Sequence, residues 1–370
     1  MSIGPITVDR MPFDPGPAAW NEILGQAKHY PPLAGERTAD VAIIGAGFAG
    51  LSAARRLHQI DPTLQVAILE ARRVAEGSAG RNSGFMIDLP HNLGSKNYTA
   101  AAEDDRQRTA MNRAAIAFAR EAATDLSMST EAFIESGKVN AAAPQKGHDH
   151  NLTYAKHLDT LGEEHELLAE TAMQQLCGST YYKGGLFTPG TAMLQPALYI
   201  RELASGAVSS TVLLFEDSPV QALERSGGGW RLKTPQGSVT AAQVILATNG
   251  HVESFGLYRR RLMHVYLYAS MTAALDEGQV NKLGGEDRWA FTPADPMGTT
   301  VRRISGTGGT RVVVRNSFTW APNRTDKPKR LQEIAHIHDK SFGARFPQFA
   351  GISMEYRWGG LLCLSRNASP

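Results

Sequence analysis

Three glycines with dinucleotide-binding spacing are the first residues of this sequence that could do chemistry. They are Gly45, Gly47 and Gly50, in the run GAGFAG. In a turn from a strand to a helix, this spacing allows a tight bend, a close approach of a pyrophosphate to the backbone, and close packing of the helix on the strand. Glu70 follows about twenty residues later, where a carboxylate accepts hydrogen bonds from ribose hydroxyls. The pattern predicts a dinucleotide site and by itself does not separate NAD from FAD.

Two apolar segments and a helical pattern between them would position these glycines. Residues 41–44 and 66–69 are apolar and largely β-branched, as expected for buried parallel strands. Between them, apolar side chains recur at helical spacing at Leu51, Ala54 and Leu57. A glycine-rich turn in another kind of α/β protein is the alternative. The order of strand, glycines, helix, strand and acid favours the dinucleotide site.

A loop of small residues follows the second strand. Residues 77–85 read GSAGRNSGF, a composition that NAD binding does not need but that suits a flat ring system lying against the backbone. The amides of Gly80, Arg81 and Asn82 could face the edge of such a ring, and nearby serine hydroxyls could donate to phosphate or ring carbonyls. An ordinary turn is the alternative.

Taken together, four segments resemble the FAD-dependent D-amino acid oxidase family. They are residues 39–57, 66–71, 77–85 and 244–251, the last of which reads VILATNGH. More narrowly, the chain is similar to the γ-glutamylputrescine oxidase-like branch, and Trp358-Gly359-Gly360 resembles that family's late W-x-G. The resemblance implies an α/β fold, with a FAD-binding Rossmann-type lobe on a parallel sheet and a second lobe built on an antiparallel β-sheet.

The resemblance also implies non-covalently bound FAD and indicates the residues that would hold it. Cys363 is late in the chain, but its spacing does not match that of a covalent flavin attachment. The matched positions are Gly45, Ala46, Gly47, Phe48, Ala49 and Gly50 at the pyrophosphate, Glu70, Ala71 and Arg72 at the adenosine ribose, Ser78, Ala79, Gly80, Arg81, Asn82, Ser83 and Gly84 along the flavin, Val220 at the adenine, and Ala247, Thr248 and Gly250 over the cofactor.

The activity implied is oxidation of the C–N bond of an amine or amino acid. A hydride passes to the flavin N5, water hydrolyses the resulting imine, and O2 or another acceptor such as a quinone reoxidises the flavin. Because the cofactor does this chemistry once the substrate is positioned, a catalytic acid–base pair is not required. We therefore assign no catalytic residue from the sequence.

Five residues are candidates for binding the substrate: Tyr266, Tyr268, Arg302, Arg315 and Trp358. An arginine could hold a substrate carboxylate bidentately. The two tyrosines alternate on a predicted strand and would point to the same side of a sheet. Core packing or ion pairing is the ordinary alternative for each of the five.

Two further hypotheses remain open. The sequence ends at Pro370 without the closing glycine-rich strand and helix of the family, so a truncated, catalytically silent FAD-binding protein is an alternative to the enzyme. An NAD-dependent dehydrogenase would explain the first strand–helix–strand unit but gives residues 77–85 no role.

Composition limits the partners. A net charge of +2 over 370 residues gives no reason to expect nucleic acid or an anionic membrane, which leaves a small-molecule substrate. Two cysteines cannot build a disulfide framework, and no signal peptide or membrane-spanning apolar run is visible, so a cytoplasmic location is predicted. The histidine pairs at 148/150 and 336/338 lack converging ligands, and no metal site is predicted. The oligomeric state is left open.

The sequence predicts an N-terminal arm at 1–36 and two lobes. A discontinuous FAD-binding lobe takes residues 37–100, 185–255 and 345–370, and a helical insert with the substrate lobe takes 101–184 and 256–344. Helices are expected in 101–136, 148–161, 163–175 and 327–342, and a strand in 352–363 should return to the FAD lobe. In the first helix the expected packing face is Met111, Ala115, Phe118, Ala122 and Leu126.

Overall fold

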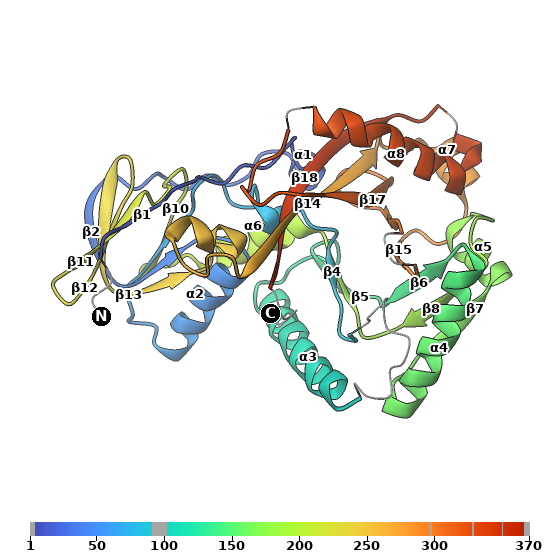
Figure 1. Ribbon diagram of the computed structural model, residues 1–370, viewed down its shortest axis with the longest axis horizontal. Coiled ribbons are helices and arrows are strands. Elements are labelled where there is room, and N and C mark those ends of the chain that lie inside the picture. Colours follow the sequence, from blue (N-terminus) through green and yellow to red (C-terminus); the bar gives the residue numbers. More distant parts are fainter. Residues whose placement is uncertain (1–3, 91–101, 296–297, 328, 350, 366–370) are drawn as a thin grey trace.

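Two β-sheets organise the chain in a computed structural model that describes residues 4–90, 102–295, 298–327, 329–349 and 351–365. The seven-stranded sheet forms the lobe at the left of Figure 1, and the eight-stranded sheet forms the lobe at the right. A small third sheet combines β4 (Phe85–Met86), β9 (Ala192–Leu194) and β5 (Phe133–Glu135). The α/β architecture with two lobes matches the fold class that the sequence predicts.

The first lobe has a parallel centre. Its order is β1 (Ile6–Thr7), β11 (Ala222–Ser226), β12 (Gly229–Lys233), β13 (Gly237–Leu246), β2 (Gly35–Ile44), β3 (Val66–Leu69) and β10 (Val212–Phe215). The last four of these run parallel, and β11 to β13 form an antiparallel meander. The parallel strands are buried because α2 (Phe48–Ile60) and α6 (Pro196–Ala207) pack against one another over the sheet. This lobe presents the end of β2 and the start of α2 toward the centre of the molecule.

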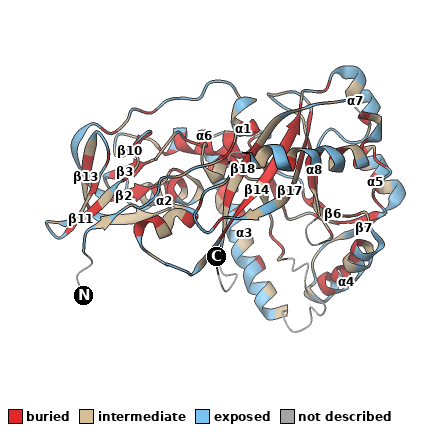
Figure 2. Cartoon of the chain, turned by 45° about the horizontal axis from the view of Figure 1, so that its top comes forward, coloured by how far each residue is buried: buried red, intermediate tan, exposed pale blue. Residues whose placement is uncertain are grey.

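The second lobe is mostly antiparallel. Its order is β18 (Met354–Ser365), β14 (Leu262–Thr272), β17 (Arg311–Trp320), β16 (Thr300–Ile304), β15 (Trp289–Pro293), β6 (Lys138–Ala142), β8 (Gly184–Thr188) and β7 (Glu166–Ala169). Only the β15–β6 pair in this described sheet is parallel. An aromatic core joins one face to α8 (Arg330–Arg345), and Figure 2 shows the strands buried beneath that helix.

The opposite face of the second sheet is turned toward the first lobe. Ala269, Val313 and Trp358 from this face share one apolar core with Ile43 and Leu51 of the first lobe. In register, Trp358 pairs with Ala269, Ala269 with Arg315, and Arg315 with Thr300. Residues that pair directly across neighbouring strands have side chains on the same face of the sheet. This row of four residues therefore crosses four strands on the face that meets the first lobe.

The remaining helices cover the outside. They are α1 (Ala19–Glu22) in the N-terminal arm, α3 (Ala102–Asp125), α4 (Gln145–Leu161), α5 (Glu170–Cys177) and α7 (Glu277–Leu283), together with the 3-10 turns η1 (Ser78–Gly80) and η3 (Asn249–Phe255). Trp20 of α1 is fully buried, so the N-terminal arm packs on the body of the molecule. No helix within the described segments is long and apolar enough to cross a membrane.

Several expected elements differ in the structure. Residues 163–175 were expected to be one helix, but β7 occupies 166–169 because Leu167 and Leu168 pair with β8, and α5 follows. The packing face of α3 differs in part: Ala122 is buried as predicted, but Met111 is 63% exposed and Ala115 is exposed, and Ile116 and Ala119 are buried instead. In an alanine-rich helix two neighbouring stripes are similarly apolar, so the sequence pattern does not identify the buried one.

The final strand was expected to return to the FAD lobe. It instead pairs with β14 at the edge of the second sheet, and it meets the first lobe through η1 and α1. The domain boundaries proposed from the sequence remain predictions.

Candidate active site

The glycine turn has the geometry that a dinucleotide needs. Gly45 has a φ of +105°, and a Cβ there would lie 2.6 Å from the carbonyl oxygen of Ala247. A Cβ on Gly50 would lie 1.9 Å from the carbonyl oxygen of Gly45. Helix α2 starts at Phe48 without a side-chain cap, so its first N–H groups are available to an anion. The turn therefore fits a pyrophosphate lying against bare backbone.

Glu70 lies at the end of β3 beside this turn. Its Oε2 accepts from the N–H of Ala46 at 2.8 Å, and its Oε1 accepts from the N–H of Arg72 at 3.1 Å. Burial raises the pKa of the Glu70 carboxyl, although these two backbone donors oppose the shift. Each carboxylate oxygen has further acceptor capacity for a ribose hydroxyl.

Several buried polar groups around the turn lack partners among the described residues. They include the Thr248 hydroxyl and the His251 Nδ1. Burial lowers the pKa of His251 to about 4, so its ring is neutral at pH 7. The backbone N–H and C=O of Val220 also have no described hydrogen-bond partner. Buried polar groups are normally hydrogen-bonded, so these groups fit a site completed by a bound ligand such as FAD.

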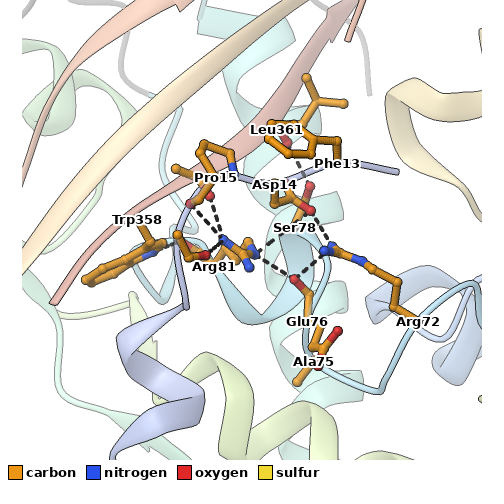
Figure 3. A network of polar contacts seen from close by, with 12 residues as sticks. Phe13, Asp14, Pro15, Arg72, Ala75, Glu76, Ser78, Arg81, Trp358 and Leu361 are labelled. Atoms are coloured by element: carbon orange, nitrogen blue, oxygen red, sulfur yellow. Dashed lines mark hydrogen bonds and ion pairs between the residues drawn. The ribbon is translucent and has the colours of Figure 1, made fainter. Parts of the chain in front are cut away.

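The loop predicted to line the flavin is anchored by segments from both ends of the chain. The Ser78 hydroxyl donates to the carbonyl oxygen of Leu361 at 2.9 Å rather than facing an open site. The Arg81 guanidinium donates through Nη1 to the carbonyl oxygens of Gly16 at 2.9 Å and Gly359 at 3.0 Å, and through Nε to that of Glu76 at 2.6 Å. Figure 3 shows these contacts around Arg81. Arg81 therefore positions the loop through its side chain.

An ion pair and two tryptophans extend this anchor. Arg72 Nη2 lies 2.5 Å from Asp14 Oδ2, as Figure 3 shows, and Asp14 Oδ1 is buried without a described partner. Trp358 Nε1 donates to the carbonyl oxygen of Arg81 at 3.0 Å, and Trp20 Nε1 donates to that of Asn82 at 2.9 Å. Trp358, a candidate for substrate binding, is 1% exposed and holds the cofactor loop.

Arg302, like Trp358, is a substrate-binding candidate whose side chain contacts the 77–85 loop. Its Nη1 donates to the carbonyl oxygens of Ser83 at 2.5 Å and Leu194 at 3.0 Å, and its guanidinium carbon lies 5.3 Å from the ring centre of Trp20. Burial lowers the pKa of Arg302 to about 9. Its described interactions are with the loop, with β9 and with the arm.

The two tyrosines point to the same side, as predicted from alternation, but to the face that α8 covers. The Tyr266 hydroxyl donates to the carbonyl oxygen of Phe13 at 2.6 Å, and the Tyr268 hydroxyl donates to Asp326 Oδ2 at 2.7 Å. Both rings are buried in a cluster with Ile334 of α8. Their sheet face is opposite to that of Ala269 and the rest of its row.

Arg302 lines one cavity, of about 360 Å³, but the carbonyl groups of Ser83 and Leu194 occupy its guanidinium. Arg315 lines another cavity, of about 510 Å³, on the face turned to the first lobe. No described residue forms a hydrogen bond or ion pair with its guanidinium, and burial lowers its pKa. The cavity is also lined by Ile87, Leu89, Pro90, Asn112, Lys138, Leu267, Thr292, Pro293, Gly298, Thr300, Asn316, Ser317 and Phe318.

Lys138 is a second cation on this cavity. It is 4% exposed, and its Nζ donates to Asn140 Oδ1 at 2.5 Å and to Thr292 Oγ1 at 3.4 Å. Burial lowers the pKa of Lys138 to about 8, and the charge of Asp88 opposes the shift. Lys138 is not among the site residues predicted from the sequence. The signal was present, because Lys138 and Asn140 alternate within an otherwise small and apolar run.

The backbone beside Arg315 is irregular. Ser317 has a φ of +63°, and the β14–β17 register shifts between Leu267 and Tyr268. A non-glycine residue in the left-handed region is uncommon and often marks a functional site. Behind it, His338 Nε2 lies 3.3 Å from the carbonyl oxygen of Asn316, which supports the cavity wall from α8.

A model of the FAD dependent oxidoreductase family matches residues 40–370. The chain belongs to this family. The match confirms the family inferred from the motifs, and it makes the chain an oxidoreductase that uses FAD. In the described part of this oxidoreductase, no three His, Cys, Asp or Glu residues gather as a metal site would require.

Relatives of this FAD-dependent oxidoreductase extend along most of its length. A probable oxidoreductase OrdL of Haemophilus influenzae is 26% identical over 354 residues, which cover 92% of this chain and 77% of the relative. The γ-glutamylputrescine oxidoreductase of Escherichia coli is 41% identical over 51 residues, 14% of this chain and 12% of that enzyme. Glycine oxidase from Geobacillus kaustophilus has a similar crystal structure, with a TM-score of 0.69 at 18% identity over 90% of this chain and 85% of that one. At this identity the last likeness concerns the fold.

Proposed function

We propose that this FAD-dependent oxidoreductase oxidises the C–N bond of an amino acid, and that Arg315 binds the substrate carboxylate. The observation that carries the proposal is the Arg315 guanidinium on the cavity wall, with which no described residue pairs. Partial burial of a cation carries a desolvation cost, and a carboxylate ligand would offset that cost with charge-assisted hydrogen bonds. The names of glycine oxidase and γ-glutamylputrescine oxidoreductase, both enzymes of amino compounds, support the same class of substrate.

The position of the cavity supports this assignment. Arg315 pairs with Ala269, which pairs with Trp358, and Trp358 contacts the backbone of Arg81 in the cofactor loop. Two strand spacings, or about 10 Å, therefore separate the Arg315 backbone from the strand that holds this loop. A carboxylate held by Arg315 would orient an amino acid between the second sheet and the loop.

The residues of the chain would bind, orient and exclude water, and FAD supplies the two-electron acceptor when bound. The glycine turn and Glu70 would hold the pyrophosphate and the ribose. We also propose that no covalent bond attaches FAD, so acid denaturation should release all flavin into the supernatant. The electron acceptor, O2 or a quinone, would be assigned by comparing flavin reoxidation rates with each.

The test is anaerobic mixing of the purified, FAD-loaded protein with D- and L-amino acids and simple amines. We expect an amino acid to bleach the flavin absorption. Replacing Arg315→Met should raise the KM for that substrate by about a hundredfold, since removing one partner of a buried charge pair costs about 2–5 kcal/mol. Arg259→Met, at an exposed position, is the control. An FAD-loaded protein that no amino acid or amine reduces would refute the proposal.

A further inference from the structure

The proposed substrate cavity carries more positive charge than one carboxylate would balance. Arg315 and Lys138 both line it, and no Asp or Glu belongs to its described lining. Neither cation forms an ion pair among the described residues. Asp88, the acid that acts on Lys138 through its charge, is itself paired with Arg113 at 3.0 Å.

The described hydrogen bonds fix the Lys138 side chain but do not use all of its donors. Its ammonium has three donors, and the Asn140 and Thr292 oxygens take two of them. Thr292 Oγ1 also donates to Asn140 Oδ1 at 2.6 Å, which fixes the amide orientation. The remaining donor is available to a ligand in the cavity that Lys138 lines.

The spacing of the two cations suits a short dianion. Arg315 pairs with Thr300, and Thr292 falls opposite Thr300, one residue beyond the Phe291–Val301 pair. Arg315 and Thr292 are therefore two strand spacings apart, roughly 10 Å between backbones. Lys138 reaches across from β6, and its Nζ lies 3.4 Å from Thr292 Oγ1. Side chains stand roughly perpendicular to a sheet, so about 10 Å also separates the two cationic groups across the strands. Two hydrogen bonds of about 2.8 Å each leave roughly 4 Å, which a carbon chain of about four or five atoms spans.

We propose that the substrate is an acidic amino acid, whose α-carboxylate binds Arg315 and whose side-chain carboxylate binds Lys138. This inference rests on the proposed function and adds the class of side chain. Lys138 is a specificity-determining residue in this arrangement. A dianion compensates the buried Lys138 and the half-buried Arg315 at once, whereas a neutral amino acid leaves the Lys138 ammonium without a counter-charge.

The test uses binding, so it does not depend on turnover. The FAD-loaded protein is titrated calorimetrically at pH 7 with succinate and glutarate, and with butyrate and valerate as monocarboxylates of equal length. We expect the dicarboxylates to bind about ten to a hundred times more tightly, the range for one charge-assisted hydrogen bond. Lys138→Met should abolish this preference, while Lys340→Met, at an exposed position of α8, should retain it.

Two outcomes would overturn the inference: equal affinities for both ligand classes in the wild-type protein, or a preference that survives Lys138→Met. The first needs no variant, so it stands even if a substitution impairs folding. Failure of the proposed function is a separate result. If the protein prefers dicarboxylates but oxidises no amino acid, the binding site is supported and the proposed reaction is wrong. If it oxidises neutral and acidic amino acids equally well, the proposed reaction is supported and the proposed specificity is wrong.

Discussion

Replacing Arg81→Met tests how strongly the cofactor loop depends on its anchor. The guanidinium donates to carbonyl oxygens of three segments: Glu76 in the loop, Pro15 and Gly16 in the arm, and Gly359 in β18. Methionine keeps the apolar stem and removes every donor. The variant therefore leaves four carbonyl groups without this partner in a largely buried junction.

The expected loss of stability follows from these contacts. Hydrogen bonds to a charged group contribute about 1.5–3 kcal/mol each, but bonds that share one guanidinium are not additive. Burial lowers the pKa of Arg81, so desolvation offsets part of the gain. Removing one partner from a buried charged network costs about 3–5 kcal/mol, and we expect a value in that range.

Urea unfolding followed by tryptophan fluorescence is the assay. Trp358 and Trp20 lie 6.2 Å apart beside the loop, so their emission reports its opening. Arg106→Met is the control, because among the described residues Arg106 pairs with Glu103 alone, at the surface, and its loss should change stability by less than about 1 kcal/mol. A loss below about 1 kcal/mol for Arg81→Met would refute the view that Arg81 holds the three segments together.

Three other predictions concern single positions. Gly50→Ala should abolish FAD binding, because the new Cβ would collide with the carbonyl oxygen of Gly45 in the turn. The measurement is the visible absorption of the purified protein. Gly343→Ala is the control and should bind FAD normally, because nothing lies within 4 Å of a Cβ at that position. For Lys138, the pKa falls from 10.5 unfolded to about 8 folded, so the unfolded chain binds more protons between those values and stability should rise with pH by on the order of 3 kcal/mol. Lys138→Met should remove that rise in chemical denaturation measured from pH 7 to 10.5, and an unchanged slope would contradict the assignment. Trp358→Phe deletes the donor to the Arg81 carbonyl and should cost about 1–2 kcal/mol in urea unfolding, with a negligible change counting against the contact.

The first strand–helix–strand unit could be predicted because its information is local. The glycines, the apolar strands and Glu70 lie within one segment, β3 has the expected bounds of 66–69, and β2 ends at Ile44 as expected although it begins at Gly35, six residues before the predicted start. These elements depend on neighbours in the sequence more than on distant packing.

The substrate cavity could not be predicted in the same way. Its two cations, Lys138 and Arg315, come from β6 and β17 and are 177 positions apart in the sequence (315 − 138). Only the pairing of strands in the sheet brings Lys138 beside Thr292. The sequence does identify Arg315 as a candidate. It does not distinguish Arg315 from Arg302, because the difference is whether nearby carbonyl groups occupy the guanidinium.

The hydrogen bond between Ser78 and Leu361 has a consequence for biosynthesis. Its two residues are 283 positions apart, and at about 5–20 residues per second the ribosome takes roughly 15–60 s to make the intervening chain. During that time the nascent cofactor loop lacks its last anchors, including the carbonyl of Gly359 and the indole of Trp358. Capture of FAD in its final geometry therefore waits for the synthesis of β18, and a slow step in making β18 would delay formation of the holoenzyme rather than folding of the first lobe.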